Sequence, residues 1–233
     1  MPRIAHHLCS LALFSDMQPA ELGALAAGCR LRLFDKGASI FRLGEPCQEF
    51  HAVVTGQVKL YGLSPSGQEK VIELLGPGES FAEALMFTDR PYIVNAQALM
   101  DSQVLSVSKQ AVLAEIARDS RFALRMLAGI SRRLHGLVHD VQASALHSGV
   151  QRVIGYLLRE HESLGGTGAT TGATQVTTVS LPFSKSAIAS RLSLTPEYFS
   201  RVLRELEDQR LIAVDKRDIH IPDLQRLACY PVR

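Results

Sequence analysis

The chain has 233 residues, enough for one large domain or two small ones with an ordinary buried core. Hydrophobic residues make up 46% and charged residues 21% of the chain, and the mean hydropathy is +0.09, which excludes intrinsic disorder and fibrous repeats. No stretch approaches the ~18 apolar residues that a membrane-spanning helix needs. We therefore expect a folded cytoplasmic protein without a membrane partner.

The cysteines and the charge distribution narrow the chemistry further. No C-x-x-C pair occurs among the four cysteines, which are Cys9, Cys29, Cys47 and Cys229. We interpret them as reduced, small apolar side chains rather than ligands of zinc or an iron–sulfur cluster. Residues 1–149 hold 14 Lys and Arg against 14 Asp and Glu, and residues 150–233 hold 11 against 9. The net charge of +2 is thus C-terminal and gives only weak support for a nucleic-acid partner.

Short β-rich runs separated by turn residues follow one another from about Arg32 to Ser108. Strands spaced about ten residues apart, with glycine at the corners, predict a small antiparallel barrel or roll. The preceding residues 1–30 favour helix, with Leu22, Leu25 and Ala26 on one face.

A long helix is predicted after the β-rich region. Its apolar residues repeat with spacings of 3, 4, 3 and 4, and they are Leu127, Ile130, Leu134, Leu137 and Val141. This narrow seam resembles a coiled coil more than the wider stripe of a core helix, so it favours a partner helix. Two heptads also allow a helix that packs only on its own barrel.

The C-terminal part begins near His147 with a predicted helix at 150–164, followed by a glycine-rich run at 165–172. This run lacks the Lys-Ser/Thr pair with which a phosphate loop grips phosphate and magnesium, so we interpret it as a flexible connector. A short β run at 175–181 follows it.

The segment from 184 to 211 carries the clearest functional signal. Ser184 is a helix N-cap, Ser193-Leu194 makes a tight turn, and Thr195 caps a second helix that begins at Pro196. Two short helices joined by so tight a turn predict a helix-turn-helix, although a solvated helix pair in a bundle would show a similar pattern. The second helix places apolar residues on its inner face, namely Phe199, Val202, Leu203 and Leu206.

The outer face of this second helix suits a DNA major groove. Glu197, Ser200 and Arg201 lie at i, i+3 and i+4 and project from one face. Arg201 can donate two hydrogen bonds to guanine, Glu197 can accept one from cytosine, and Ser200 can touch a thymine methyl or a base acceptor. A β-hairpin of winged type follows at 211–221. We expect contacts to the DNA backbone from Ser184, Thr195, Arg204, Lys216 and Arg217.

The helix-turn-helix segment resembles that of the CRP/FNR transcription regulators. Five motifs of the β-rich region also fall in order where this family has its effector domain: Asp35-Lys36-Gly37, Gly44-Glu45, Gly56-Gln57-Val58-Lys59, Gly67-Gln68-Glu69-Lys70 and the run from Phe81 to Phe87. The resemblance implies an α+β protein with an antiparallel, cyclic-nucleotide-binding-like β-roll effector domain (1–110), a long dimerisation helix (111–147) and a winged helix-turn-helix DNA-binding domain (148–233). It further implies a homodimeric, ligand-gated transcription regulator rather than an enzyme, with double-stranded DNA and RNA polymerase as partners.

Departures from the family pattern indicate the branch. Relatives that sense cyclic nucleotides carry Gly-Glu and, about ten residues later, Arg-Ser, whereas this chain has Ala82-Glu83 and then Ile93-Val94. Loss of the cation aimed at the phosphate removes a contact worth ~1.5–3 kcal/mol, so we expect that cAMP is not the effector. The cysteine spacing excludes the oxygen-sensing branch. What remains resembles the dissimilative nitrate respiration regulators, which implies haem-based sensing of nitric oxide and recognition of TTGAT inverted repeats.

Several histidines could hold the haem iron, and no other metal is expected. The candidate ligands are His6 and His7, unless the N-terminus is simply mobile. We interpret His51 as a hydrogen-bonded barrel residue, and His135 and His139 as a solvated pair because no third ligand lies nearby.

Two other classes of function compete with a regulator. A metal-dependent enzyme on a small barrel would need clustered His and Glu ligands on its strands, where only His51 is available. A pure interaction module would not need the Glu197, Ser200 and Arg201 pattern. Salt-dependent binding to duplex DNA would separate these alternatives.

Overall fold

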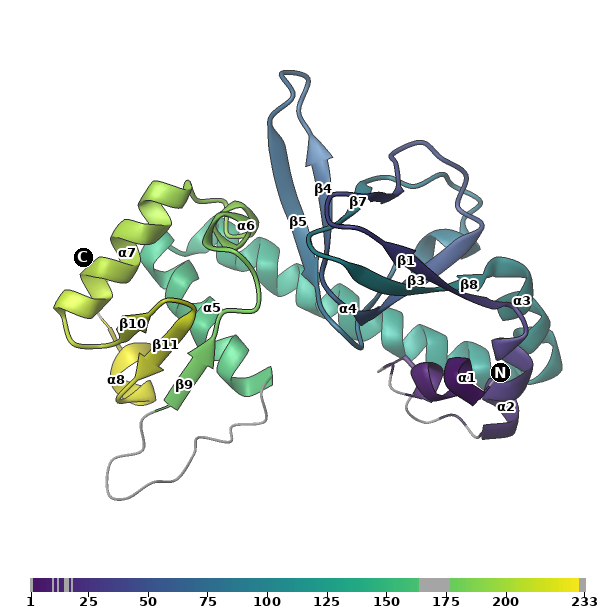
Figure 1. The fold of residues 1–233 in the computed structure, drawn as a ribbon. Helices are drawn as coiled ribbons and strands as arrows, with labels where there is room; N and C mark the ends of the chain where they lie inside the picture. The colour runs from purple at the N-terminus through teal and green to yellow at the C-terminus, as the bar shows by residue number, and fades with distance from the viewer. Residues whose placement is uncertain are drawn as a thin grey trace. The chain divides into compact units, whose positions relative to one another are not determined.

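The computed structural model describes residues 2–163, except 10, 12, 15, 16 and 18, and residues 177–230. The predicted connector at 165–172 lies outside the described residues. The chain divides into two compact units, Met1–Leu137 and Val138–Arg233. The predicted fold class is confirmed, because a β-roll, a long helix and a winged helix-turn-helix follow one another along the chain (Figure 1). No helix in the described part of the chain is long and apolar enough to cross a membrane.

Two antiparallel sheets form the β-roll of the first unit. One has the strand order β1-β8-β3-β6 and the other β2-β7-β4-β5. The strands are β1 (Cys29–Phe34), β2 (Ser39–Phe41), β3 (Glu49–Thr55), β4 (Val58–Leu63), β5 (Glu69–Leu75), β6 (Ser80–Phe81), β7 (Asn95–Ala98) and β8 (Ser102–Ser108). Strands β3 and β8 are rich in aromatic and β-branched residues, and their Phe50, Val53, Val104 and Val107 are fully buried. The core therefore lies between the two sheets.

Two short helices precede the roll, α1 (Pro2–Cys9) and α2 (Pro19–Ala26), and β1 begins three residues before the predicted start of the β-rich region. Leu22, Leu25 and Ala26 are buried, as predicted. Phe14 stacks on Phe122 of α4 (Ser120–Leu146), with ring centroids 5.9 Å apart. The N-terminal segment is thus part of the core of the first unit rather than a separate arm.

The segment predicted as one dimerisation helix consists of two helices, α3 (Lys109–Arg118) and α4. Asp119 separates them with an extended backbone (φ −142°, ψ 106°). Its carboxylate accepts a hydrogen bond from the backbone N–H of Arg121 at 3.0 Å. A short acidic side chain that bonds to its own neighbouring backbone competes with helical hydrogen bonds, which explains the break.

The second unit contains the helices α5 (Gly149–Ser163), α6 (Lys185–Arg191), α7 (Pro196–Asp208) and α8 (Leu224–Ala228). Its small antiparallel sheet has the order β10-β11-β9, with β9 (Thr177–Ser180), β10 (Ala213–Asp215) and β11 (Asp218–Ile221). The inner face of α7 is buried, as predicted, through Phe199, Val202, Leu203 and Leu206. These side chains hold α7 on the unit and leave its opposite face exposed.

Candidate nucleic-acid interface and effector cavity

Two hydroxyl groups begin the helices of the helix-turn-helix. The Ser184 hydroxyl oxygen accepts a hydrogen bond from the N–H of Ala187 at 3.2 Å, and that of Thr195 accepts one from the N–H of Tyr198, also at 3.2 Å. Both residues are therefore N-caps, as the sequence predicted. Both are exposed, so a role in contacting the DNA backbone stays a prediction for them.

The turn between α6 and α7 is closed by backbone and side-chain contacts. Ser193 adopts a left-handed conformation (φ 58°), and Leu194 N–H donates to the carbonyl oxygen of Ala189 at 2.9 Å. The guanidinium of Arg152 on α5 donates to the carbonyl oxygen of Leu192 at 2.8 Å, at the C-terminus of α6. Arg152 thus fixes the turn from outside the motif, and no local spacing predicted this contact.

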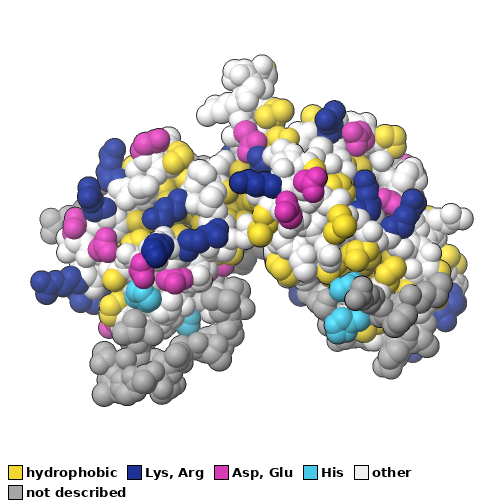
Figure 2. Space-filling view, viewed as in Figure 1, with side chains coloured by type: hydrophobic (Ala, Val, Ile, Leu, Met, Phe, Trp, Pro, Cys, Tyr) yellow, Lys and Arg dark blue, Asp and Glu magenta, His cyan; other side chains and the backbone are white. Residues whose placement is uncertain are grey.

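The predicted base-contacting residues share the exposed face of α7. Glu197, Ser200 and Arg201 are all exposed, as is Arg204. The Ser200 hydroxyl donates to the carbonyl oxygen of Pro196 at 2.9 Å, and the Arg201 guanidinium lies 5.9 Å from the Tyr198 ring centre. Figure 2 shows Lys and Arg side chains, interspersed with acidic ones, on the second unit over the region of α7. The structure thus brings the candidate residues together on one accessible surface.

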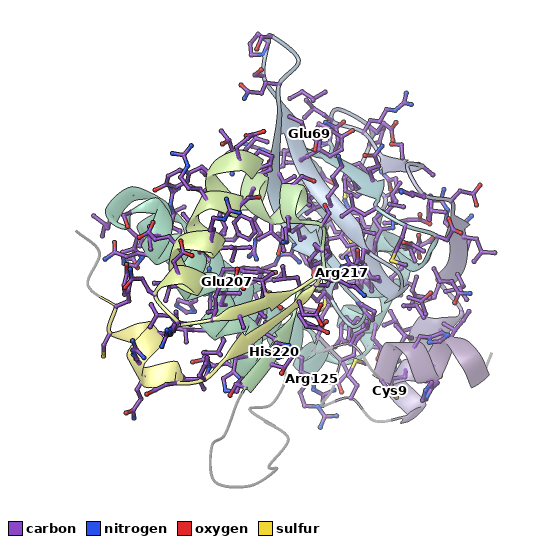
Figure 3. All side chains as sticks on the ribbon, turned by 60° about the vertical axis from the view of Figure 1, so that its left-hand side comes forward. Cys9, Glu69, Arg125, Glu207, Arg217 and His220 are labelled. Atoms are coloured by element: carbon purple, nitrogen blue, oxygen red, sulfur yellow. The ribbon has the colours of Figure 1, made fainter. Side chains whose placement is uncertain are left out.

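The wing is the β10–β11 hairpin, and Arg217 lies at its tip (Figure 3). Lys216 takes a left-handed conformation (φ 54°) that turns the chain between the two strands. Both side chains are exposed, and the Arg217 guanidinium donates to the carbonyl oxygen of Pro182 at 3.4 Å. The predicted phosphate-contacting residues therefore lie on a second element beside the α7 helix.

The start of α5 packs closely on α7. A Cβ atom on Gly149 would lie 2.3 Å from the Tyr198 ring, far inside van der Waals contact. Only glycine permits this approach. The face of α7 that carries Tyr198 is therefore held by α5 as well as by the apolar core.

The predicted dimer seam leaves an exposed apolar face on α4. Leu127, Leu134 and Val141 are 57%, 58% and 68% exposed, Leu137 is at the margin of exposure, and Ile130 is half-buried. A different stripe of α4 faces the roll and includes the fully buried Phe122 and Met126. The chain's own described residues do not cover the seam, so the alternative of a helix packed only on its own barrel does not account for it.

A cavity of about 190 Å³ lies between the roll and α4 within the first unit. Its walls include Leu13, Leu75 and Gly129, together with acidic and basic side chains. A Cβ atom on Gly129 would lie 2.3 Å from Leu13, so glycine lets the N-terminal segment approach the helix at this wall. Among the described residues, this is the cavity that joins the roll to the long helix.

Arg133 of α4 holds two carboxylates of the roll in this cavity. Its guanidinium donates to Glu73 on β5 and, at 3.3 and 3.4 Å, to the two oxygens of Glu83 in the 3₁₀ helix η1 (Glu83–Phe87). It also donates to the carbonyl oxygen of Ser80, whose hydroxyl donates to Glu83. Burial alone would lower the pKa of Arg133, but the carboxylates of Glu83 and Glu73 raise it above its usual value. The sequence analysis missed Arg133 because residues 73, 83 and 133 meet only in the folded chain.

The residues that depart from the cyclic-nucleotide pattern lie close to this cluster. Ala82 has a left-handed backbone (φ 68°), a conformation that favours glycine. Ile93 is 63% exposed, and Val94 is half-buried. Because Glu83 already accepts from Ser80 and Arg133, a ligand hydroxyl would have to compete with these contacts.

His51 is buried and hydrogen-bonded on both ring nitrogens, as the sequence predicted. Nδ1 lies 3.0 Å from the Ser106 hydroxyl and Nε2 lies 3.1 Å from the Tyr92 hydroxyl. Tyr92 donates its proton to the carbonyl oxygen of Glu49 at 2.8 Å, which assigns the ring proton to Nε2 and the acceptor role to Nδ1. Burial, assisted by the positive charge of Arg32, lowers the pKa of His51 to about 3. A neutral ring with both nitrogens engaged is a poor metal ligand.

The cavity beside α4 does not fit a haem. Its volume is below the ~300–1,000 Å³ of pockets for drug-sized ligands, and its described lining residues include no His, Cys, Met or Tyr to bind iron. His6 and His7 lie on α1 with ring centroids 6.0 Å apart, and neither lines this cavity. His135 is exposed. The described residues contain no cluster of three or more His, Cys, Asp or Glu that could hold a metal ion.

Two family models match the two units. A cyclic nucleotide-binding domain matches residues 31–119, and a Crp-like helix-turn-helix domain matches residues 151–230. A curated relative, the CRP-like cAMP-activated global transcriptional regulator of Mycobacterium tuberculosis, is 23% identical over 221 residues, which are 95% of this chain and 96% of that protein.

Solved structures agree with this assignment. DNR from Pseudomonas aeruginosa is 37% identical, covers 97% of this chain and 96% of its own, and has a TM-score of 0.51. FixK2 from Bradyrhizobium japonicum has a TM-score of 0.73 over 85% of this chain and 95% of its own. Its 24% identity supports the fold alone. The likeness to DNR extends over both units at a level that establishes a common family.

Proposed function

The chain belongs to the CRP/FNR family of ligand-responsive, DNA-binding transcription regulators, and on that premise we propose that a dimer of it recognises TTGAT half-sites in an inverted repeat. The observation that carries this proposal is the exposed face of α7, where Glu197, Ser200 and Arg201 project together. Three side chains of this spacing and chemistry can enter one major groove and contact adjacent base pairs.

A homodimer follows from the uncovered seam. An inverted repeat has two-fold symmetry, and a two-fold dimer places one α7 on each half-site. The seam residues of α4 supply an apolar face that a second copy of the same helix would cover. Lys216 and Arg217 on the wing would contact phosphates and set the register without selecting sequence.

Binding titrations on a TTGAT inverted repeat and on a scrambled duplex of equal length test the proposal. We expect the repeat to bind at least about a hundredfold more tightly, since specific sites commonly exceed nonspecific ones by more than this. Measuring both affinities over a range of salt concentrations separates backbone contacts from base recognition. Equal affinity for the two duplexes, with and without nitric oxide, would disprove the assignment of α7 as a base-recognising helix.

The effector stays a prediction, and nitric oxide bound to haem is the one that the family resemblance implies. Haem would supply an iron that binds the gas, with His6 or His7 as candidate ligands, but the described cavity beside α4 does not support such a site. An absorption spectrum of the purified protein mixed with haem, with and without nitric oxide, decides the matter. An unchanged free-haem spectrum would reject the haem hypothesis; an unchanged spectrum of the His6→Ala/His7→Ala variant relative to wild type would reject these ligands.

Two further predictions concern small-molecule and protein partners. We expect no cAMP binding in calorimetry at micromolar concentrations, because Ile93 cannot pair with a phosphate and Arg133 is already held by two carboxylates. Contact with RNA polymerase also stays a prediction. Transcription in vitro with purified polymerase, from a promoter that carries the inverted repeat, measures whether the bound protein changes the rate of initiation.

A further inference from the structure

Helix α4 carries two stripes of different character. The stripe that faces the roll runs through Phe122, Met126, Gly129 and Arg133, with spacings of 4, 3 and 4. It begins with fully buried apolar side chains and ends with a largely buried guanidinium. The five residues after Arg133 are all exposed. Arg133 is thus the polar end of the contact between α4 and the roll, one turn before the boundary between the two units at Leu137.

The two carboxylates that Arg133 binds come from separate parts of the roll. Glu73 lies on β5, Glu83 lies in η1, and both are largely buried. Without the guanidinium, two partly desolvated negative charges would face each other at short range, which is costly. The cluster therefore depends on α4 being present, and α4 is held by the cluster. A simple apolar contact would not create this mutual dependence.

We propose that Arg133 is a positioning residue that fastens α4 to the roll where the helix leaves the first unit, so that an occupant of the cavity acts on DNA binding by loading or releasing this guanidinium. The inference rests on the proposed function, because it assumes that DNA affinity reports on the state of α4. The coupling is a physical one: ligand contacts to Glu73 or Glu83 change the free energy of the Arg133 bonds, and only a difference of this kind can shift the equilibrium of the helix.

Replacing Arg133 by alanine leaves a space shaped for a guanidinium group, and this gives the experiment a specific probe. We expect Arg133→Ala to bind the TTGAT repeat at least about tenfold more weakly than wild type, because charge-assisted hydrogen bonds at the base of the helix are lost. Added methylguanidinium at millimolar concentration should restore much of that affinity to Arg133→Ala and change wild type little. Arg133→Lys should recover part of the affinity, since one ammonium group cannot reproduce a planar guanidinium that bridges two carboxylates. The matched control is Arg132→Ala, which removes the same charge from the preceding, exposed position.

Hydrogen exchange of the α4 amides provides a readout that does not depend on DNA. We expect faster exchange in α4 of Arg133→Ala, reversed by methylguanidinium, with the exchange of α7 unchanged. The proposal is overturned if Arg133→Ala matches Arg132→Ala in both measurements, or if its defects are not reversed by methylguanidinium, which would leave Arg133 a purely structural role. If wild type binds no DNA, the proposed function fails while the exchange data still decide the tether.

Discussion

The two units of this protein present their chemistry in opposite ways. In the second unit, the candidate DNA-contacting residues are exposed, lie within one turn of one helix and are positioned by caps a few residues away. In the first unit, the polar cluster is largely buried and draws Glu73, Glu83 and Arg133 from three elements separated by up to 60 residues. A surface that recognises a long, charged partner needs accessible side chains, whereas a cavity that responds to a small ligand needs enclosure.

The contrast teaches that the first unit is the more fragile of the two in its function. A local helix motif keeps its geometry as long as its own caps and apolar face persist. An ion cluster joined across three elements changes whenever any of them moves, because leaving one buried charge unpaired is strongly unfavourable. Four variants test this comparison, beginning with the one of largest expected effect.

A charge in the seam should abolish both dimerisation and DNA binding. Leu134→Glu would bury two carboxylates beside each other in the dimer, at a cost of ~3–5 kcal/mol or more. We expect monomers in sedimentation velocity and loss of tight binding to the inverted repeat. Leu113→Glu on α3 is the control, because it adds the same charge at an exposed apolar residue outside the seam. An intact Leu134→Glu dimer would show that the seam is not the interface.

Removing the guanidinium of Arg201 should erase sequence preference without unfolding the helix. Arg201→Ala is expected to cost ~1–3 kcal/mol per half-site and to remove discrimination at the guanine. Lys216→Ala on the wing is the contrasting variant, since it should weaken binding to all duplexes alike and flatten the salt dependence. Titrations on repeats with single base changes measure both effects. Full discrimination by Arg201→Ala would reject its role as a base contact.

The pH dependence of stability should come in part from the buried His51. Its pKa is about 3 in the folded protein and about 6.5 when unfolded, so the unfolded chain alone takes up the proton as the pH falls below 6.5. Stability should therefore fall by about 2 kcal/mol between pH 7 and pH 5 from this group, and continue to fall towards pH 3. Urea unfolding of His51→Gln should lack this component. His135→Gln, at an exposed position, should retain it; identical pH profiles for His51→Gln and wild type would contradict the assignment.

The smallest expected effect concerns the cap of α7. Thr195→Ala removes the oxygen that accepts from the N–H of Tyr198 and should cost ~1 kcal/mol of local stability. Hydrogen exchange at the first turn of α7 measures the loss. Thr195→Ser keeps the oxygen and serves as the control. If both variants exchange alike, the cap does not hold the start of the helix.

Much of the second unit could be predicted from the sequence because its signals are local. Ser184, Thr195 and Pro196 mark helix starts within a few residues, and the apolar spacing of α7 predicts its buried face. The division of α3 from α4 was missed, since Asp119 is a single short side chain whose bond to the next turn outweighs helical continuity only in this context. Element types were predicted well and element boundaries less well.

By itself the sequence determined the β-roll, the seam of α4 and the exposed face of α7, because periodicity and capping act between neighbours along the chain. Only the tertiary structure decided that α4 turns Phe122 and Met126 towards the roll and leaves Leu134 exposed, that Arg152 closes the turn of the helix-turn-helix, and that Arg133 joins Glu73 to Glu83. These contacts join residues far apart in the chain, and their energies depend on burial and distance, which no local spacing encodes.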